Sequence, residues 1–425
     1  MISRPEMINH NTSKIEKLLQ KGVKIPNPQC VEIGAEVDVD RISGDGVVIY
    51  SGCKIFGRST LILRGVKLGY EGPVTIENCQ IGPEVDLNGG FFRQAVFLKK
   101  ASAGSGSHVR EGTILEEEAN TAHNVALKQT ILLPFVTLGS LINFCDCCMS
   151  GGTSRQDHSE VGSSYIHFNY TPNQDKATPS LIGDVPGGVM LNQRPIFLGG
   201  QGGLIGPCRL AFGTTIAAGS ICRNDVLEPG RLIFEGNVKS GSVPFIPNIY
   251  QNIKRTTLNN NIYIANLIAL EHWYTHVRSQ FITDDFPEIL FDGLNEKLNM
   301  AIDERVKRFK ALSQKMPDSI EAYKNFAKDK ASALVLQQKQ ELYDRWTELE
   351  ASFGAQRNMA GKNELRDEFC EKIRLGIKTW GKDYIAVIKG LQAGDAEIGT
   401  RWLQGIVDAV TAEALKVMPS FRSSG

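Results

Sequence analysis

A six-residue spacing of aliphatic and small residues is the feature that most constrains the fold of this chain. Leu210, Ile216 and Cys222 are six residues apart, and Gly213 and Gly219 keep the same spacing. One inward aliphatic residue and one small corner residue in every six are typical of a β-helix built from hexapeptides. An α-helix has a period of 3.6 residues and an ordinary strand a period of two, so neither explains the spacing. The sequence therefore predicts a β-helix with glycine at tight corners.

The same step recurs in the first half of the chain, with breaks in phase. Ile49, Ile55 and Leu61 keep it, for example, and inserted residues then shift the count. We expect loops to leave the β-helix where the repeat is poor, at residues 101–107 and 148–159. An antiparallel sandwich with glycine-rich turns is the alternative for the earliest repeats.

Two other regions have the apolar spacing of amphipathic helices. Residues 12–22 and residues 256–418 place apolar side chains three and four positions apart. Prolines and glycines divide the second region into about five helices. We predict three parts, namely an N-terminal helix and linker (1–24), a β-helix (25–250) and an α-helical domain (251–425). The fold class is mainly β plus α.

Charge and composition argue against several classes of partner. The 425 residues include 47 basic and 47 acidic side chains, and the pI is near 7, which gives no sign of a nucleic-acid or anionic membrane partner. The first ten residues lack a signal-peptide core, and no run of eighteen apolar residues occurs. Nine cysteines, an odd number, fit reduced thiols. We expect a soluble cytoplasmic protein that binds neither nucleic acid nor membrane.

A series of motifs in residues 14–230 resembles the acetyltransferase domain of the bifunctional bacterial enzyme family that makes UDP-N-acetylglucosamine. The matching segments are residues 15–27, 109–115, 125–128, 182–184, 197–206 and 215–219. The resemblance implies a left-handed parallel β-helix that assembles as a homotrimer. The chain begins where the family's uridyltransferase domain would end, so no uridyltransferase activity is expected.

The resemblance also implies a site for a sugar phosphate or nucleotide sugar. Arg110 and Lys128 match the arginine and lysine that hold the substrate phosphate in the family. Asn169, Tyr170 and Lys176 match residues that contact sugar and phosphate. A guanidinium can bind phosphate through two hydrogen bonds, and lysines supply compact charge. The alternative is that each is a solvated charge at a β-helix corner.

The implied co-substrate is acetyl-CoA or another acyl-CoA. Ala218 matches the family's alanine whose backbone lies against the pantetheine arm, and Gly200 stands where the family has a serine. About ten extra residues around 187–194 are inserted beside this presumed groove. We expect no metal, because Cys145 and Cys148 have no matching cysteine or histidine pair at zinc spacing.

The family's general base is missing from its expected position. Ser140 stands where the family has a histidine, and Asn143 where it has a tyrosine. A serine cannot replace imidazole as a proton acceptor near neutral pH. His158, flanked by Asp157 and Glu160, is the predicted replacement, because a neighbouring carboxylate raises the basicity of imidazole. An ordinary surface histidine is the alternative. Other candidates are His167, His108 and His123.

Two functions are consistent with these residues. The first is a hexapeptide-repeat N-acyltransferase that acts on an amino sugar phosphate or nucleotide sugar. The second is a non-catalytic sugar-nucleotide-binding or scaffold protein that has lost the family's base. In the second case the helical domain would bind a protein partner.

Overall fold

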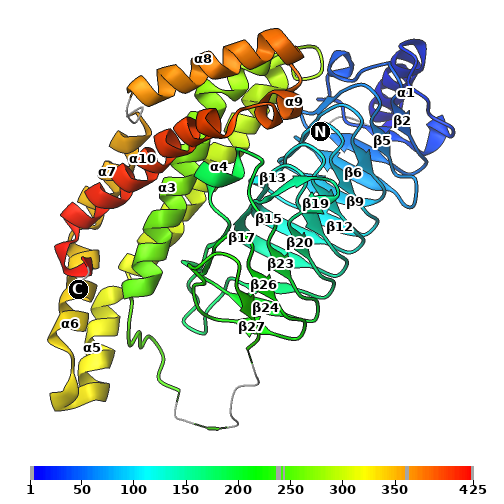
Figure 1. Ribbon diagram of the computed structural model, residues 1–425. Helices are drawn as coiled ribbons and strands as arrows, with labels where there is room; N and C mark the ends of the chain where they lie inside the picture. Colours follow the sequence, from blue (N-terminus) through cyan, green and yellow to red (C-terminus); the bar gives the residue numbers. More distant parts are fainter. Residues whose placement is uncertain (1–3, 236–240, 243–244, 359–362, 423–425) are drawn as a thin grey trace.

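The computed structural model describes residues 4–235, 241–242, 245–358 and 363–422, and its first half is a parallel β-helix (Figure 1). Leu210 of β25 (Arg209–Leu210), Ile216 of β26 (Thr215–Ile216) and Cys222 of β27 (Ile221–Cys222) lie on three successive faces, and all three are buried. The six-residue step is therefore the step from one face to the next. The predicted β-helix followed by a helical domain is confirmed.

Each face is a ladder of short parallel strands, one from each coil. Face one contains β1 (Glu32–Ile33), β3 (Lys54–Phe56), β6 (Val74–Glu77), β9 (Gly90–Arg93), β12 (Ser107–Val109), the first parts of β15 (Ala126–Leu132) and β17 (Asn143–Met149), β21 (Ile166–Phe168), β24 (Gly203–Ile205) and β27. Face two contains β4 (Leu61–Ile62), β7 (Gln80–Ile81), β10 (Ala95–Phe97), β13 (Thr113–Leu115), the second parts of β15 and β17, β22 (Ser180–Ile182) and β25. Face three contains β2 (Val48–Ile49), β5 (Lys67–Leu68), β8 (Asp86–Leu87), β11 (Ser102–Ala103), β14 (Asn120–Thr121), β16 (Thr137–Leu138), β20 (Glu160–Val161), β23 (Phe197–Leu198), β26 and β28 (Leu232–Ile233).

Apolar side chains stack in register inside the β-helix. On face one, Val109 pairs with Leu127, which pairs with Phe144, and all three are buried. Each added coil therefore buries further inward side chains, most of them aliphatic or aromatic, and extends the hydrogen-bonded ladder. This repetition fixes which residues point outward, and the outward positions carry the candidate site.

The prediction of a loop at residues 101–107 was wrong. Ser102 and Ala103 form β11, and Ala103 stacks in register between Leu87 and Thr121 inside the β-helix. Small side chains fill the interior here, so this coil lacks the aliphatic residues that define the repeat elsewhere. Within residues 148–159, β18 (Gly152–Ser154) and β19 (Asp157–His158) form an antiparallel hairpin.

Helices precede and follow the β-helix. They are α1 (Arg4–Gln20), the short α2 (Val185–Gly188) within the β-helix region, α3 (Lys254–His276), α4 (Glu288–Ser313), α5 (Met316–Ala327), α6 (Ala333–Asp344), α7 (Trp346–Arg357), α8 (Asn363–Trp380), α9 (Tyr384–Lys389) and α10 (Ala393–Val417). The C-terminal region thus has eight helices in its described residues, from α3 to α10, where about five were predicted. The boundary between α6 and α7 at Arg345 has neither proline nor glycine to mark it. None of the described helices has the length and apolar character needed to cross a membrane.

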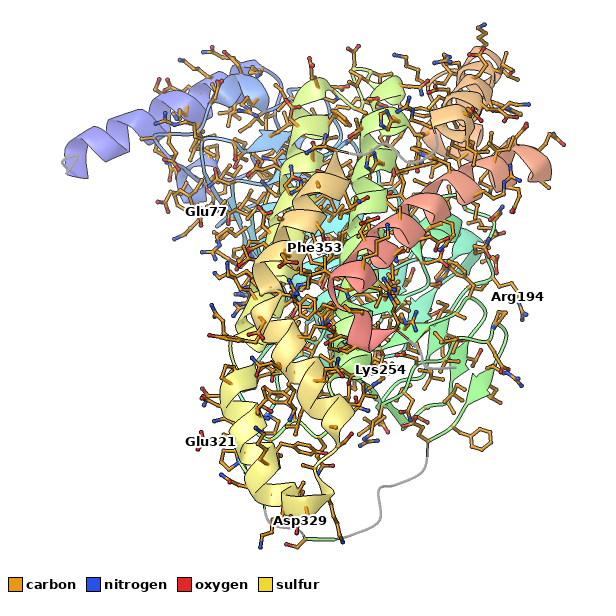
Figure 2. The ribbon with its side chains drawn as sticks, turned by 90° about the vertical axis from the view of Figure 1, so that its left-hand side faces the viewer. Glu77, Arg194, Lys254, Glu321, Asp329 and Phe353 are labelled. Carbon is orange, nitrogen blue, oxygen red and sulfur yellow. The ribbon has the colours of Figure 1, made fainter. Side chains whose placement is uncertain are left out.

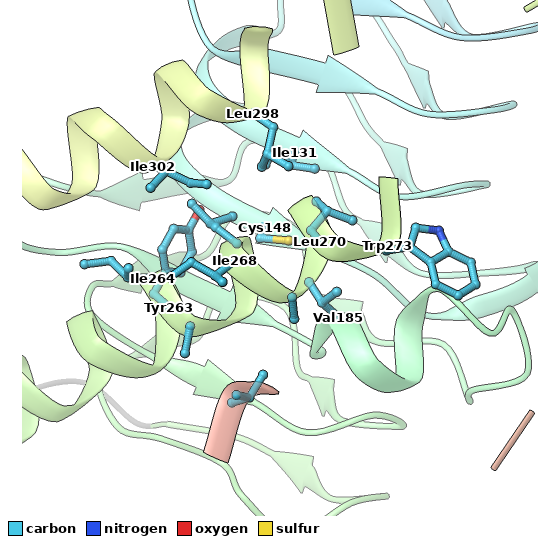
Figure 3. Close-up of a cluster of buried hydrophobic side chains, with 14 of the residues drawn as sticks. Ile131, Cys148, Val185, Tyr263, Ile264, Ile268, Leu270, Trp273, Leu298 and Ile302 are labelled. Atoms are coloured by element: carbon cyan, nitrogen blue, oxygen red, sulfur yellow. The ribbon is translucent and has the colours of Figure 1, made fainter. Parts of the chain in front are cut away.

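The helical domain covers face two. Helix α4 lies against β7, β10, β13 and β15, and α3 lies against β22. Figure 2, viewed from the helical side, shows the helices in front of the strands. Figure 3 shows the shared core, in which Ile131 and Cys148 of the β-helix meet Ile264 and Ile268 of α3 and Leu298 of α4. Within the part of the chain that the structure describes, the main contacts between the helical domain and the strands fall on face two.

A buried charged cluster lies between face two and the helices. Tyr274 of α3 donates a hydrogen bond to Glu116 Oε1 at 2.5 Å, and the Arg278 guanidinium lies 2.5 Å from Glu117 Oε1. The Arg278 guanidinium also contacts two aromatic rings. Its central carbon lies 3.8 Å from the centroid of Tyr384 and 4.6 Å from the centroid of Phe286. Burial raises the pKa of Glu116 to about 7; Glu117 adds to the rise, and Arg278 and Tyr274 oppose it.

Glu116 is therefore expected to weaken the folded state as the pH rises. Its folded pKa exceeds its ordinary value of 4.5, so its favourable contribution is complete below pH 4.5 and is lost as the pH rises through about 7. Glu116→Gln keeps an acceptor for Tyr274 but cannot ionise. Urea unfolding should show the variant about 2 to 3 kcal/mol more stable than the parent at pH 8 and nearly equal to it at pH 4.5. An identical difference at both pH values would contradict this.

Candidate functional site

The predicted site residues lie at all three corners of the β-helix. The one–two corner, where face one turns into face two, carries Arg110, Lys128, Asn169, Tyr170 and Lys176. The three–one corner, where face three turns into face one, carries Ser140, Gly200 and Ala218. His158 lies at the two–three corner. Face one thus connects the predicted phosphate-binding residues with Ser140, where the family has its base, and with the predicted acyl-CoA positions.

Cationic side chains converge at the one–two corner. The register that pairs Val109 with Leu127 places Arg110 beside Lys128, and Lys128 pairs in turn with Cys145. Burial raises the pKa of the Cys145 thiol; Asp146 adds to the rise, and Arg110, Lys128 and Lys176 oppose it. The three cations come from three different coils, and all three lie near the Cys145 thiol.

A carboxylate and a further arginine complete this cluster. Glu111 Oε1 lies 2.7 Å from Lys128 Nζ, and Glu111 Oε2 lies 3.0 Å from Arg93 Nη2. Burial alone would raise the pKa of Glu111, but hydrogen bonds from Lys128, its own backbone and Arg93 bring it to about 2. Glu111 is thus ionised near neutral pH and orients both cations. Arg93, Arg110, Lys128 and Lys176 outnumber the carboxylates of Glu111 and Asp146, so the cluster attracts anions.

The segment between β21 and β22 supplies the other predicted contacts. Asn169 donates from Nδ2 to Asp146 Oδ2 at 2.9 Å. Tyr170 is 56% exposed, and Lys176 Nζ lies 5.7 Å from the centroid of its ring. An exposed aromatic ring beside an ammonium group gives a surface on which a sugar ring can pack.

The three–one corner contains an imidazole next to the position of the missing base. Ser140 Oγ lies 2.9 Å from Nδ1 of His123, which stands one coil earlier, and the His123 side chain is exposed. If Nδ1 carries the proton and donates it to Ser140, Nε2 presents a free lone pair. The corner thus offers a basic nitrogen.

The same corner consists of small residues packed backbone to backbone. A Cβ on Gly199 would lie 2.3 Å from Ala218 N, and a Cβ on Gly200 would lie 2.6 Å from Ser163 O. A Cβ on Gly219, in contrast, would meet no atom within 4 Å. The surface at Gly219 is therefore open, and a narrow chain can approach the backbone there.

An outward row of side chains crosses face one between these corners. Register places His108, Ala126, Asn143 and Ile166 side by side in four coils. His108 stacks on Phe91 with ring centroids 5.2 Å apart. His108 and Asn143 therefore lie between the imidazole of His123 and the cations at the far corner.

The other two candidate bases are placed differently. His158 donates from Nδ1 to Arg155 O at 2.8 Å, and its Nε2 lies 3.7 Å from Glu160 Oε2, at the two–three corner. His167 is buried, with Nδ1 2.6 Å from Cys145 O and Nε2 2.8 Å from Ser180 Oγ. Burial lowers the pKa of His167 to about 4. Within one chain neither histidine lies on the outer surface of face one.

The insertion lies away from the presumed acyl-CoA groove. Helix α2 packs against α3 and α10 at the two–three corner, so these residues support the helical domain. All nine cysteines are free thiols. Among the residues that the structure describes, no three histidine, cysteine, aspartate or glutamate side chains form a metal-binding group. A separate cavity of about 900 Å³, lined by Arg278 and Trp380 among others, lies between the domains.

Sequence reasoning passed over three residues of this surface. It did not consider Arg93 and Glu111, and it ranked His123 below His158. Residues one coil apart become neighbours, but the number of residues in a coil varies, so this signal was weak. Arg93 lies one coil before Arg110, and His123 lies one coil before Ser140.

Comparison with known proteins supports the resemblance inferred from the motifs. No protein-family model matches the chain. The chain is 28% identical over 217 residues to the bifunctional protein GlmU of Thermotoga maritima, covering 50% of this chain and 42% of that protein. It is also 28% identical over 229 residues to bifunctional protein GlmU of Lawsonia intracellularis, covering 54% of this chain and 45% of that protein. The chain spans less than half the length of these curated relatives.

The fold and these matches define a class of protein. A three-faced parallel β-helix built from hexapeptides forms the scaffold of the chain. This scaffold and the GlmU relatives fit a GlmU acetyltransferase-like domain, as the motifs predicted. The motifs that carry the resemblance lie in residues 14–230, before the helical domain.

Proposed function

We propose that the protein transfers an acyl group from an acyl-CoA to the amine of an amino sugar phosphate or an amino nucleotide sugar. The observation that carries this proposal is the layout of face one, which has clustered cations at one end and an exposed imidazole at the other. An acceptor with a phosphate and an amine separated by a sugar ring has the same order of groups. The GlmU relatives support the choice of an amino sugar.

The phosphate binds at the one–two corner. Arg110 offers a planar fork of donors, and Lys128 and Lys176 add compact charge. Glu111 holds Lys128 in place from the side. Asn169 and Tyr170 contact the sugar, and the amine then points along face one toward the three–one corner.

The acceptor amine attacks the thioester carbonyl and loses its proton to His123. The carbon–sulfur bond then breaks, and the CoA thiolate leaves and takes up that proton as the free thiol. In this proposal His123 Nδ1 carries the other ring proton and donates it to Ser140 Oγ, 2.9 Å away, so that Nε2 is the nitrogen that receives the amine proton. From His123 to Lys128 is five residues, at most about 16 Å of extended chain. A hexose phosphate and the long Lys128 side chain together cover this separation. His158 remains the alternative base if a neighbouring subunit brings its two–three corner to this surface.

The small residues of the three–one corner fit an acyl-CoA arm. Gly200 and Ala218 would hold the arm through their backbone groups, and the open side of Gly219 leaves room for it. Acyl-CoA supplies an acyl group activated as a thioester. His123 is exposed at the same corner, so it can accept the amine proton beside the thioester.

The proposal includes a homotrimer. The helical domain covers face two, so faces one and three, as far as the structure describes them, have most of their outer surface left for contacts between chains. Ile166, Phe168 and Phe197 on these faces are 41 to 43% exposed although they are large and apolar. Packing of neighbouring chains against these faces would bury them and enclose the site from water.

An acyl-transfer assay tests the proposed function. Purified protein is incubated with acetyl-CoA and glucosamine 1-phosphate, and release of the CoA thiol and the mass of the product are followed. We expect thiol release and a product heavier by one acetyl group. Glucosamine, which lacks the phosphate, and N-acetylglucosamine 1-phosphate, which lacks the free amine, serve as controls. Binding of the sugar phosphate without transfer would indicate a sensor, and absence of binding would indicate a scaffold; either result overturns the proposal.

A further inference from the structure

The segment that carries three of the proposed substrate contacts is held by the helical domain. Residues 169–179 lie between β21 and β22, outside the strands of the β-helix. Tyr250 donates to Asp175 Oδ2 at 2.6 Å, and Lys315 Nζ donates to Asn173 O at 2.8 Å. Asn260 of α3 donates to the backbone of the same segment at 2.9 Å. Its conformation therefore depends on residues far away in the sequence.

Arg305 of α4 lies at the centre of these contacts. Its Nη2 lies 2.6 Å from Asp146 Oδ1, and its Nη1 donates to Lys176 O at 3.2 Å. The other carboxylate oxygen of Asp146 accepts the hydrogen bond from Asn169. One guanidinium thus fixes the backbone of Lys176 directly and the side chain of Asn169 through Asp146.

Burial makes this arrangement specific. The side chains of Arg305 and Asp146 are 2% and 5% exposed, so both charges are shielded from solvent. Loss of one member of a buried ion pair leaves the other charge uncompensated. A lysine has no fork of donors with which to span a carboxylate and a carbonyl together.

We propose that Arg305 is a positioning residue for the sugar-phosphate site, and that the helical domain acts through it to order residues 169–176. The segment becomes a rigid part of the site only when α4 is docked on face two. The role of Arg305 in substrate binding rests on the proposed function. Its role in ordering the segment does not.

Arg308 offers a matched control on the same helix. It lies three residues after Arg305, pairs with Glu304 of its own helix at 2.6 Å, and is 30% exposed. Arg305→Met and Arg308→Met therefore each remove one guanidinium group from α4, but only the first removes a contact with residues 169–176. A double variant, Asp146→Asn with Arg305→Met, removes both buried charges and serves if the single variant does not fold.

Hydrogen exchange followed by mass spectrometry, with calorimetric titration of glucosamine 1-phosphate, tests the inference. In Arg305→Met, amides of residues 169–178 should exchange at least about tenfold faster, while strands β12 and β15 stay protected. The Kd for glucosamine 1-phosphate should rise about tenfold or more, and Arg308→Met should match the parent in both readouts.

The two readouts separate this inference from the proposed function. Unchanged exchange in a folded Arg305 variant overturns the ordering role. Faster exchange with unchanged sugar-phosphate affinity overturns the role in binding. If the parent does not bind glucosamine 1-phosphate at all, the proposed function fails, and the exchange result alone decides whether Arg305 orders the segment.

Discussion

Replacing His123 by asparagine is expected to lower kcat for acyl transfer about 100- to 1000-fold, with little change in KM for the sugar phosphate. His123 supplies a nitrogen that can accept the amine proton, and an amide cannot do so. Asparagine keeps a polar group next to Ser140, so the corner itself should survive. Steady-state kinetics with glucosamine 1-phosphate and acetyl-CoA measure the effect.

His158→Asn is the matched control for this variant. His158 lies at the two–three corner and donates to Arg155 O, so its loss should change kcat less than twofold in the same assay. A large fall in His158→Asn with normal turnover in His123→Asn would assign the base to His158 and contradict the role of His123.

Replacing Arg110 by methionine is expected to weaken binding of glucosamine 1-phosphate about 10- to 100-fold. Hydrogen bonds to charged groups contribute about 1.5 to 3 kcal/mol each, which corresponds to this range. Methionine keeps an unbranched apolar chain beside Lys128 but removes the guanidinium donors. Calorimetric titration measures the Kd of parent and variant.

Arg58→Met is the control for general charge effects. Arg58 is exposed and lies at the same one–two corner, in an earlier coil before β4. Its loss should leave the Kd within about twofold, because salt screens charges that lie several coils apart. Equal weakening by both substitutions would mean that net charge, not a site at Arg110, governs binding.

The β-helix could be predicted because its repeat is local. The spacing of Leu210, Ile216 and Cys222 reports the step from face to face directly, and glycines mark the corners. The face that the helices cover also has a signature in the sequence. Val96 and Phe97, for example, are adjacent in the sequence, and both are buried. Such aliphatic pairs indicate a strand that is apolar on both sides, as face two is.

The candidate site could be predicted only in part. Arg110 and Lys128 were found through the resemblance, but their neighbourhood depends on coil lengths. Ile33 and Ile55 are 22 residues apart, whereas Val109 and Leu127 are 18 apart. Because the interval varies, the contact between His123 and Ser140 could not be read from the sequence with a fixed step.

Long-range contacts were beyond sequence reasoning. The pairing of Arg305 with Asp146 joins a helix to a β-helix corner across about a third of the chain. Amphipathic spacing indicates that α4 buries one side, but it does not say which surface receives it. The control of residues 169–176 by the helical domain therefore emerged only from the structure.

The most direct test is a crystal structure of the protein with glucosamine 1-phosphate bound. The account predicts the phosphate within hydrogen-bonding distance of Arg110 and Lys128, and the amine on face one directed toward His123. A sugar phosphate bound elsewhere, for example in the cavity beside Arg278 and Trp380, with the one–two corner unoccupied, would contradict it.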